Sequence, residues 1–187
     1  MKIVLASSSP RRKELMQKIS AEFLIDVSDV DETVSEDLSP IEAVKTIAYR
    51  KGEVVRHRHP DNLVISADTI VVIDNEIIGK PVDELDAIRI LNKLNNRTHI
   101  VYTAYCLFYK DKFFEDVVAS EVVFNHLSNE LINEYVKSKS PLDKAGAYGV
   151  QDNDTYPIVK EIKGSLTNVI GFPVEDIKKS IDIFLNN

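Results

Sequence analysis

The chain has 187 residues, of which 44% are hydrophobic and 28% charged, and these proportions exclude a globally disordered protein. Its net charge of −7 argues against a protein that coats a nucleic-acid duplex, although a few local cations suffice to bind a small phosphorylated ligand. The single cysteine excludes an internal disulfide framework and favours a reducing, cytoplasmic location, and the longest uncharged run in the most apolar region, 98–109, is too short to cross a membrane.

The first part of the chain alternates strand and helix patterns. Pro10 suits the first turn of a helix, because its fixed φ and missing N–H are tolerated there. Ser39, Pro40 and Glu42 form a capping-box pattern that marks the start of another helix. We expect strands over residues 3–6 and 23–27 and helices over 11–19 and 40–56.

The middle of the chain is richer in strand patterns. Residues 63–73 are the most β-prone stretch, and Asp74-Asn75 then predicts a hairpin turn. Beyond that turn we expect strands over 77–78, 100–109 and 113–124, helices over 84–94 and 128–136, a loop-rich quarter after residue 140, and a final helix over 174–185. Leu85, Ile88, Leu91 and Leu94 have the helical spacing within 84–94, and Ser128 is the expected cap of 128–136.

These elements predict an α/β fold with a mixed sheet, because alternating strands and helices are followed by a long hairpin. No internal repeat or linker divides the chain. We therefore expect residues 1–187 to form a single domain, either one compact unit or two lobes around a central cleft.

The first candidate site is the run from Ser7 to Arg12, which lies between a predicted strand and a predicted helix. The free N–H groups of a helix start, several hydroxyls and two guanidinium groups at such a turn favour phosphate binding. The alternative is that Ser9 only caps the helix and that Arg11 and Arg12 are solvated.

The second candidate is Asp68, the only charge in the apolar stretch 63–73. A carboxylate in such surroundings is costly unless it is paired or binds a metal. Asp68 is therefore a candidate to accept a proton from an attacking water or to bind a divalent cation. The structural alternative is a carboxylate at a strand end or bulge, hydrogen-bonded to the backbone.

The third candidate is the segment 144–151, whose two glycines allow close approach of a flat ligand. Gln151 ends the segment with an amide that both donates and accepts, which suits the edge of a base, although a simple glycine-containing turn explains the pattern equally well. Taken singly, Lys51 and Glu32 are typical of solvated side chains, and Glu32 lies in the acidic run 29–37. Lys80 lies between Gly79 and Pro81, a fixed loop setting that suits a reaching amine but is not specific for one.

Seven segments, in this order and spacing, resemble the Maf family of nucleoside triphosphate pyrophosphatases: LASSSPRR, VDET, AYRKGEVV, SADTIVVIDNEIIGKP, RTHIVYTAY, PLDKAGAYGVQ and IKGSLTNVIGFPVE. The resemblance implies a Maf/ITPase-like fold with a mixed, elongated sheet flanked by helices, commonly in a homodimer. It also implies hydrolysis between the α- and β-phosphates with Mg²⁺ or Mn²⁺. The segment KAGAYGVQ resembles the branch that acts on dTTP and UTP rather than the 7-methyl-GTP branch, which implies clearance of non-standard or excess pyrimidine nucleotides.

The resemblance also implies roles for individual residues. Asp68 matches the proton acceptor and Glu32 the second acid, and both are candidate metal ligands. The positions that match triphosphate contacts are Ser7, Ser9, Arg12, Lys51 and Lys80, and those that match substrate choice are Arg11, Thr69 and Gln151. Asp152 departs from the glycine that usually follows the glutamine. Two alternatives are a non-enzymatic, nucleotide-binding regulator of cell division and septum formation, and an ITP/XTP-type pyrophosphatase.

Overall fold

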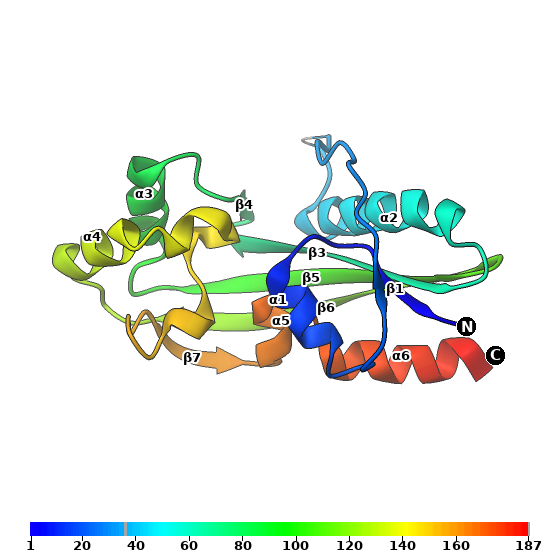
Figure 1. Cartoon of the computed structure of the whole chain (residues 1–187). Coiled ribbons are helices and arrows are strands. Elements are labelled where there is room, and N and C mark those ends of the chain that lie inside the picture. The colour runs from blue at the N-terminus through cyan, green and yellow to red at the C-terminus, as the bar shows by residue number, and fades with distance from the viewer. Residues whose placement is uncertain (36, 187) are drawn as a thin grey trace. The chain divides into compact units, whose positions relative to one another are not determined.

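The computed structural model describes residues 1–35 and 37–186. Glu36, part of the predicted acidic run, and Asn187, the last residue of the predicted domain, lie outside the described residues. The chain divides into two compact units (Figure 1). Unit 1 comprises Met1–Thr69, Thr103–Val118 and Gly171–Asn187, and unit 2 comprises Ile70–Tyr102 and Ala119–Ile170.

The first five elements follow the predicted order. They are β1 (Ile3–Leu5), α1 (Pro10–Met16), β2 (Leu24–Ile25), α2 (Pro40–Arg58) and β3 (Leu63–Ile73). The capping box is confirmed, since Ser39 caps α2 and its backbone N–H is bound by the Glu42 side chain. Helix α1 ends three residues earlier than predicted, because the amide of Ile19 bonds to the carbonyl of Met16 in a tight turn instead of continuing the helix. Strand β2 is also shorter than predicted.

The middle elements are β4 (Glu76–Ile78), α3 (Glu84–Leu94), β5 (Thr98–Tyr109), β6 (Lys112–Phe124) and α4 (Asn129–Lys137). The predicted hairpin turn is confirmed. Asp74 and Asn75 both have positive φ, at 53° and 62°, as a tight turn between antiparallel strands requires. Ser128 caps α4 as predicted, and its side chain accepts a hydrogen bond from the amide of Leu131.

The last quarter contains more regular structure than the sequence predicts. Three short 3₁₀ turns, η1 (Ser140–Asp143), η2 (Ala145–Ala147) and η3 (Val150–Asp152), precede β7 (Val159–Lys163) and α5 (Leu166–Ile170), and α6 (Val174–Asn186) follows. Strand β7 was not predicted, because three of its five residues, Lys160, Glu161 and Lys163, are charged and its apolar residues do not alternate. The strand forms through antiparallel pairing with β6, a partner distant in sequence.

The predicted mixed sheet is confirmed. Seven strands take the order β2-β1-β3-β5-β6-β7, with β4 paired to β3. Strand β1 is parallel to β2 and β3, whereas β4 is antiparallel to β3. Strands β3, β5 and β6 contribute residues to both units.

Two helices cover opposite faces of the sheet in unit 1 (Figure 1). On the α2 face, the Ser66 hydroxyl donates to the carbonyl of Ala48, and a Cβ on Gly52 would lie 2.2 Å from the Phe108 ring. On the α6 face, the Tyr105 and Ser180 hydroxyls share a 2.7 Å hydrogen bond. Because residues 105 and 108 alternate along β5, these contacts fix one helix on each face.

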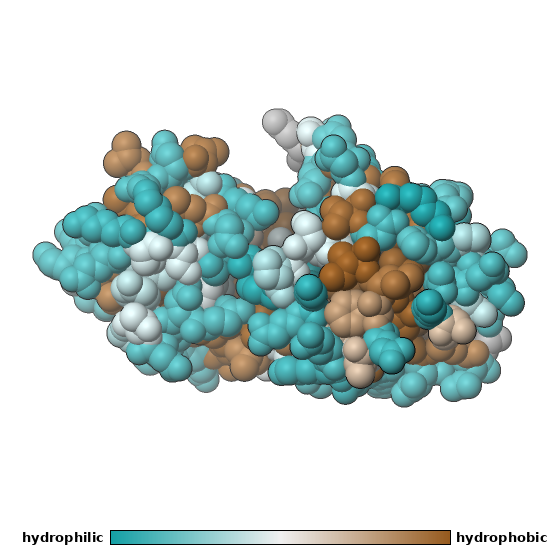
Figure 2. Space-filling model, viewed as in Figure 1, coloured by the Kyte–Doolittle hydropathy of each residue, from teal (hydrophilic) through white to brown (hydrophobic). Residues whose placement is uncertain are grey.

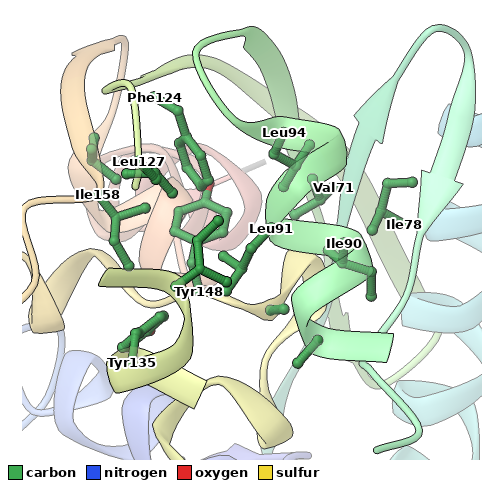
Figure 3. Packing of buried hydrophobic residues seen from close by; sticks show 14 of the residues in the cluster. Val71, Ile78, Ile90, Leu91, Leu94, Phe124, Leu127, Tyr135, Tyr148 and Ile158 are labelled. Carbon is green, nitrogen blue, oxygen red and sulfur yellow. The ribbon is translucent and has the colours of Figure 1, made fainter. Parts of the chain in front are cut away.

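A large apolar cluster packs around α3 in unit 2 (Figure 3). Ile90, Leu91 and Leu94 of α3 pack in one cluster with residues from β3, β6 and α4. Leu85 does not belong to it, since it is 77% exposed, and its place in the predicted apolar stripe was wrong. The structure turns Ala87 and Ile90 inward, so the buried face of α3 is rotated from the predicted one.

The edge strand of unit 1 exposes apolar side chains, which Figure 2 shows as a brown area over β1 and β2. Leu24 and Ile25 are 40% and 44% exposed. Within residues 1–35 and 37–186, no helix combines the length and apolarity needed to cross a membrane.

Candidate active site

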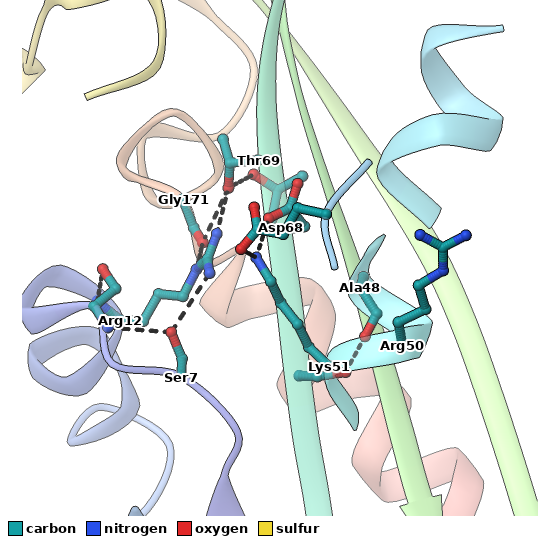
Figure 4. Close-up of polar contacts among 12 residues, drawn as sticks. Ser7, Arg12, Ala48, Arg50, Lys51, Asp68, Thr69 and Gly171 are labelled. Carbon is teal, nitrogen blue, oxygen red and sulfur yellow. Dashed lines mark hydrogen bonds and ion pairs between the residues drawn. The ribbon is translucent and has the colours of Figure 1, made fainter. Parts of the chain in front are cut away.

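Asp68 lies in the middle of β3, and its side chain is buried against an ion-pair partner (Figure 4). The Lys51 Nζ donates to Asp68 Oδ1 over 2.7 Å. The strand continues through Asp68, so the alternative of a carboxylate at a strand end was wrong. Pairing with an ammonium group is what allows the carboxylate to occupy this buried position.

Lys51 joins a second carboxylate to the first. Its Nζ lies 3.0 Å from Glu32 Oε1, so one ammonium group bridges Glu32 and Asp68. The Lys51 side chain is only 14% exposed, and the expectation that it is a solvated lysine was therefore wrong. The sequence could not predict this pairing, because Glu32 lies in the irregular segment before α2 and Lys51 lies within that helix.

Arg50 positions the backbone on both sides of Glu32. Its Nη1 donates to the carbonyl of Asp31 over 3.1 Å and to that of Thr33 over 2.7 Å. Because Arg50 precedes Lys51 on α2, consecutive residues of one helix bind the loop's backbone and the Glu32 carboxylate. These contacts attach Glu32 and its two neighbours, Asp31 and Thr33, beside Asp68.

Arg12 is held by three oxygen acceptors (Figure 4). Its Nε donates to the Gly171 carbonyl over 2.9 Å, Nη2 to Thr69 Oγ1 over 3.0 Å, and Nη1 to Ser7 Oγ over 3.5 Å. The alternative of a solvated Arg12 was therefore wrong. The guanidinium fork is fixed before any ligand arrives, which lowers the entropy lost when an anion binds.

The electrostatic surroundings of Arg12 connect it with the two acids. Burial lowers the pKa of the Arg12 guanidinium, and the charge of Asp68 opposes that shift most strongly. Arg11 lowers this pKa further, whereas Glu32 raises it. Two cationic and two anionic side chains of unit 1 therefore act on one another, although burial has the largest effect on Arg12.

Ser7 and Ser9 shape the turn between β1 and α1. Ser9 is the N-cap of α1, and its hydroxyl accepts from the amide of Arg12 over 3.4 Å, so the expected capping by Ser9 is confirmed. Ser7 Oγ accepts from the Ser9 amide over 3.2 Å and from Arg12. The hydroxyl proton of Ser7 is used in neither bond and is available to an oxygen of a ligand.

Ser7, Arg12, Thr69, Thr103 and Gly171 form one hydrogen-bonded group, the Arg12 cluster. Thr103 and Gly171 were not predicted from the sequence. Thr103, on β5, shares a 3.0 Å hydrogen bond with Thr69. Gly171 supplies its carbonyl from a backbone φ of 111°, and a Cβ there would lie 3.1 Å from Thr69 Oγ1. Close approach and positive φ together explain the glycine. Thr103 gave no signal because β5 carries several other hydroxyl side chains, and no motif in the sequence sets this one apart.

The predicted site residues of unit 1 therefore fall into two groups. Glu32 and Asp68 share the ammonium group of Lys51, and Ser7, Ser9, Arg12 and Thr69 are linked by hydrogen bonds, with Arg11 next to Arg12 in the chain. Lys80 and Gln151 belong to unit 2, where both are exposed. Gln151 lies in η3. Lys80 follows Gly79, whose carbonyl accepts a 3.0 Å hydrogen bond from the amide of Gly146. The loop that carries Lys80 is therefore attached to the segment that leads to Gln151.

Comparisons with known proteins agree with the expectation from the sequence motifs. The model of the family described as Maf-like protein matches residues 2–183. A Bacillus cereus (strain AH187) protein named dTTP/UTP pyrophosphatase is 40% identical over 183 residues, which are 98% of this chain and 95% of that protein.

Solved structures give the same fold at low sequence identity. A HAM1 protein from Coxiella burnetii matches with a TM-score of 0.54 and 15% identity, covering 98% of this chain and 99% of its own. The Staphylococcus aureus Ham1 protein matches with a TM-score of 0.54 and 18% identity, covering 97% and 98%. At these identities, the likeness establishes the fold alone.

Proposed function

The chain belongs to the Maf family, and on that premise we propose that it is a nucleoside triphosphate pyrophosphatase acting on dTTP and UTP. The reaction splits the bond between the α- and β-phosphates and releases a nucleoside monophosphate and pyrophosphate. The observation that carries the proposal is the bridge from Glu32 through Lys51 to Asp68, which lies in the same unit as the fixed Arg12 cluster.

The cations of unit 1 account for triphosphate binding by a chain of net negative charge. Arg12 presents a guanidinium group that protein acceptors already orient, and Ser7 adds a hydroxyl beside it. Lys51 contributes an ammonium group next to the two carboxylates. In phosphoryl transfer, such positioned charges do most of the protein's work, because they stabilise charge that spreads over the phosphate oxygens.

Asp68 is the proposed proton acceptor for the attacking water. Lys51 contacts its Oδ1, so that ion pair does not use Oδ2, which is the oxygen available to take a proton from water. Asp68 acting as a ligand of a divalent cation, or through water bound to that cation, is the alternative route for the same carboxylate. Glu32 is the second acid in either case.

The carboxylates also fit a divalent cation, for which we propose Mg²⁺ or Mn²⁺. Residues 1–35 and 37–186 contain no group of three or more His, Cys, Asp or Glu side chains arranged to hold a metal. Mg²⁺ commonly takes only one or two carboxylates and completes its coordination with water and substrate phosphates. Asp68 and Glu32 supply the carboxylates, and a cation bound there would neutralise charge on the phosphates.

The remaining parts of the proposal rest on the resemblance. Lys80 is proposed to contact the triphosphate, and Arg11, Thr69 and Gln151 to select the nucleotide. We also propose that residues 1–187 act as one domain, that the chain forms a homodimer and that it is located in the cytoplasm. Light scattering after size-exclusion chromatography measures the mass of the particle in solution. A homodimer would have twice the chain mass of 21.1 kDa.

A substrate panel tests the proposed activity. The purified protein is incubated with dTTP, UTP, ITP or XTP and Mg²⁺, and pyrophosphate, orthophosphate and nucleoside monophosphate are measured. We expect equal amounts of pyrophosphate and monophosphate, with dTTP and UTP consumed fastest. Faster turnover of ITP or XTP would support the ITP/XTP-type alternative. Binding of dTTP without any hydrolysis would support the regulator.

A further inference from the structure

The turn that carries Gln151 is unusually constrained. The Lys144 and Asp152 side chains pack directly against Gly149, two residues earlier, since a Cβ there would lie 2.7 Å from Lys144 Cε and 3.1 Å from Asp152 Oδ2. The amide of Asp152 donates to the Gly149 carbonyl over 3.0 Å and closes the turn around Val150 and Gln151. Gln151 itself is exposed at the surface of unit 2.

The side chain of Asp152 connects this turn to the rest of unit 2. Its Oδ2 accepts from the Tyr135 hydroxyl and from the Ser140 hydroxyl, each over 2.7 Å. Lys144 Nζ lies 3.9 Å from the same oxygen. Three elements, α4, η1 and the start of η2, therefore place polar groups around one carboxylate oxygen.

Tyr135 binds both ends of the turn. Its hydroxyl donates to Asp152 and accepts from the amide of Gly149 over 3.0 Å. The Tyr135 side chain, which Figure 3 shows on α4, is fully buried. Burial, and then the neighbouring Asp152, raise the pKa of its phenol, so the hydroxyl keeps the proton that it donates. A buried phenol thus fixes the residues on both sides of Val150-Gln151.

A fixed backbone matters for an amide that reads a base. Uracil and thymine present a carbonyl oxygen beside an N–H group, whereas cytosine presents an amino group beside a ring nitrogen acceptor. A glutamine amide matches either edge if its oxygen and nitrogen exchange places. Discrimination therefore depends on how the amide meets the base. A backbone that does not shift fixes the point from which the side chain reaches the base.

We propose that Asp152 is a positioning residue that fixes the turn carrying Gln151 and thereby strengthens the selection of uracil and thymine nucleotides over cytosine nucleotides. This inference rests on the proposed function. It assigns a role in substrate choice to the residue that departs from the usual glycine. Asp152 acts through Tyr135 and the turn, and its side chain need not touch the substrate.

The test compares kcat/KM for UTP and CTP in the wild type and in Asp152→Ala, Asp152→Asn and Tyr135→Phe. UTP and CTP carry the same triphosphate, so a loss of folding or of phosphate binding lowers both values by one factor. We expect the UTP/CTP ratio to fall about tenfold in Asp152→Ala and in Tyr135→Phe, each of which removes the Tyr135–Asp152 hydrogen bond. Asp152→Asn keeps an acceptor oxygen and should retain the ratio within about twofold.

Asp143→Ala is the matched control, because Asp143 also pairs with Lys144, over 2.9 Å, and its side chain is 64% exposed. We expect its ratio to stay at the wild-type value. An unchanged ratio in Asp152→Ala, or a wild type that consumes UTP and CTP equally, overturns the inference and leaves the proposed function standing. A wild type that hydrolyses no nucleoside triphosphate overturns both.

Discussion

Strand β3 carries polar side chains in its unit 1 part and only apolar side chains in its unit 2 part. The part in unit 1 ends with Ser66, Asp68 and Thr69, each of which has a hydrogen-bond partner from another segment of unit 1. The part in unit 2, 70–73, is apolar and contributes to the cluster around α3. Buried polar groups are costly unless paired. The half of β3 with paired polar side chains is therefore the half that we expect to matter for catalysis. The apolar half should matter for the free energy of unfolding.

The comparison predicts its largest effect at Asp68. Asp68→Asn keeps the size of the side chain but removes the charge that pairs with Lys51 and the basicity that a proton acceptor needs. We expect kcat for dTTP to fall about 10³-fold while the protein stays folded, as measured by pyrophosphate release and circular dichroism. If Asp68→Asn turned over dTTP at nearly the wild-type rate, Asp68 would not be the proton acceptor.

In unit 2 the same logic predicts a loss of stability instead of activity. Leu91 is fully buried, and Leu91→Ala should lower the free energy of unfolding by about 3 kcal/mol because it leaves a cavity. Leu85→Ala on the same helix, where Leu85 is 77% exposed, should change it by less than about 0.5 kcal/mol. Urea unfolding measures both. Equal effects of the two substitutions would contradict the rotated buried face of α3.

A smaller effect on catalysis is expected at the lysines. Lys51→Ala should reduce kcat/KM for dTTP about 30-fold, because it removes both a cation and the bridge between Glu32 and Asp68. Lys80→Ala should reduce it less. Lys45→Ala is the control on α2, since Lys45 pairs with Glu115 over 2.7 Å, away from these acids, and it should leave kcat/KM unchanged. If Lys45→Ala lowered kcat/KM as much as Lys51→Ala does, the loss of any positive charge from α2 would explain the effect, and the bridge between Glu32 and Asp68 would not.

The smallest effect concerns pH and His99, which is buried in unit 2 beside the Tyr148 hydroxyl. Burial lowers the pKa of His99 to about 4. The unfolded chain, with an ordinary pKa of about 6.5, therefore takes up a proton before the folded one does. The stability that neutral His99 allows is complete above pH 6.5 and is lost as the pH falls towards 4. Between pH 6.5 and 5 the loss should be about 1.5 kcal/mol.

His99→Gln keeps a polar partner for Tyr148 but cannot titrate in this range. The variant should therefore lose about 1.5 kcal/mol less than the wild type over the same pH interval, as measured by urea unfolding at both pH values. Identical losses in the two proteins would show that His99 is not the source of the acid sensitivity.

The local part of this structure was predictable from the sequence. The hairpin at Asp74-Asn75 and the caps at Ser39 and Ser128 follow from side chains that bind or bend their own neighbourhood. Helix α3 was placed correctly, but its buried face was not, because Leu85 shares the apolar spacing and yet is 77% exposed. Periodicity predicts that a helix has a buried face; the neighbouring elements decide which one it is.

The candidate site was predictable as a set of residues but not as a geometry. The motifs marked Arg12, Lys51 and Asp68, yet the partners that fix them lie far away in sequence. The Gly171 carbonyl reaches Arg12 across 159 positions, and no local pattern indicates such a contact. In the same way, the network around Asp152 depends on Tyr135, which reads only as a buried residue of α4.

The most direct test of the central claim is a crystal structure of the protein with Mg²⁺ and a dUTP analogue whose α–β bridging oxygen is replaced by an imido group. We expect the α-phosphate to lie beside Asp68 and the phosphate chain to contact Arg12 and Lys51. A nucleotide bound with its phosphates away from these three side chains would contradict it.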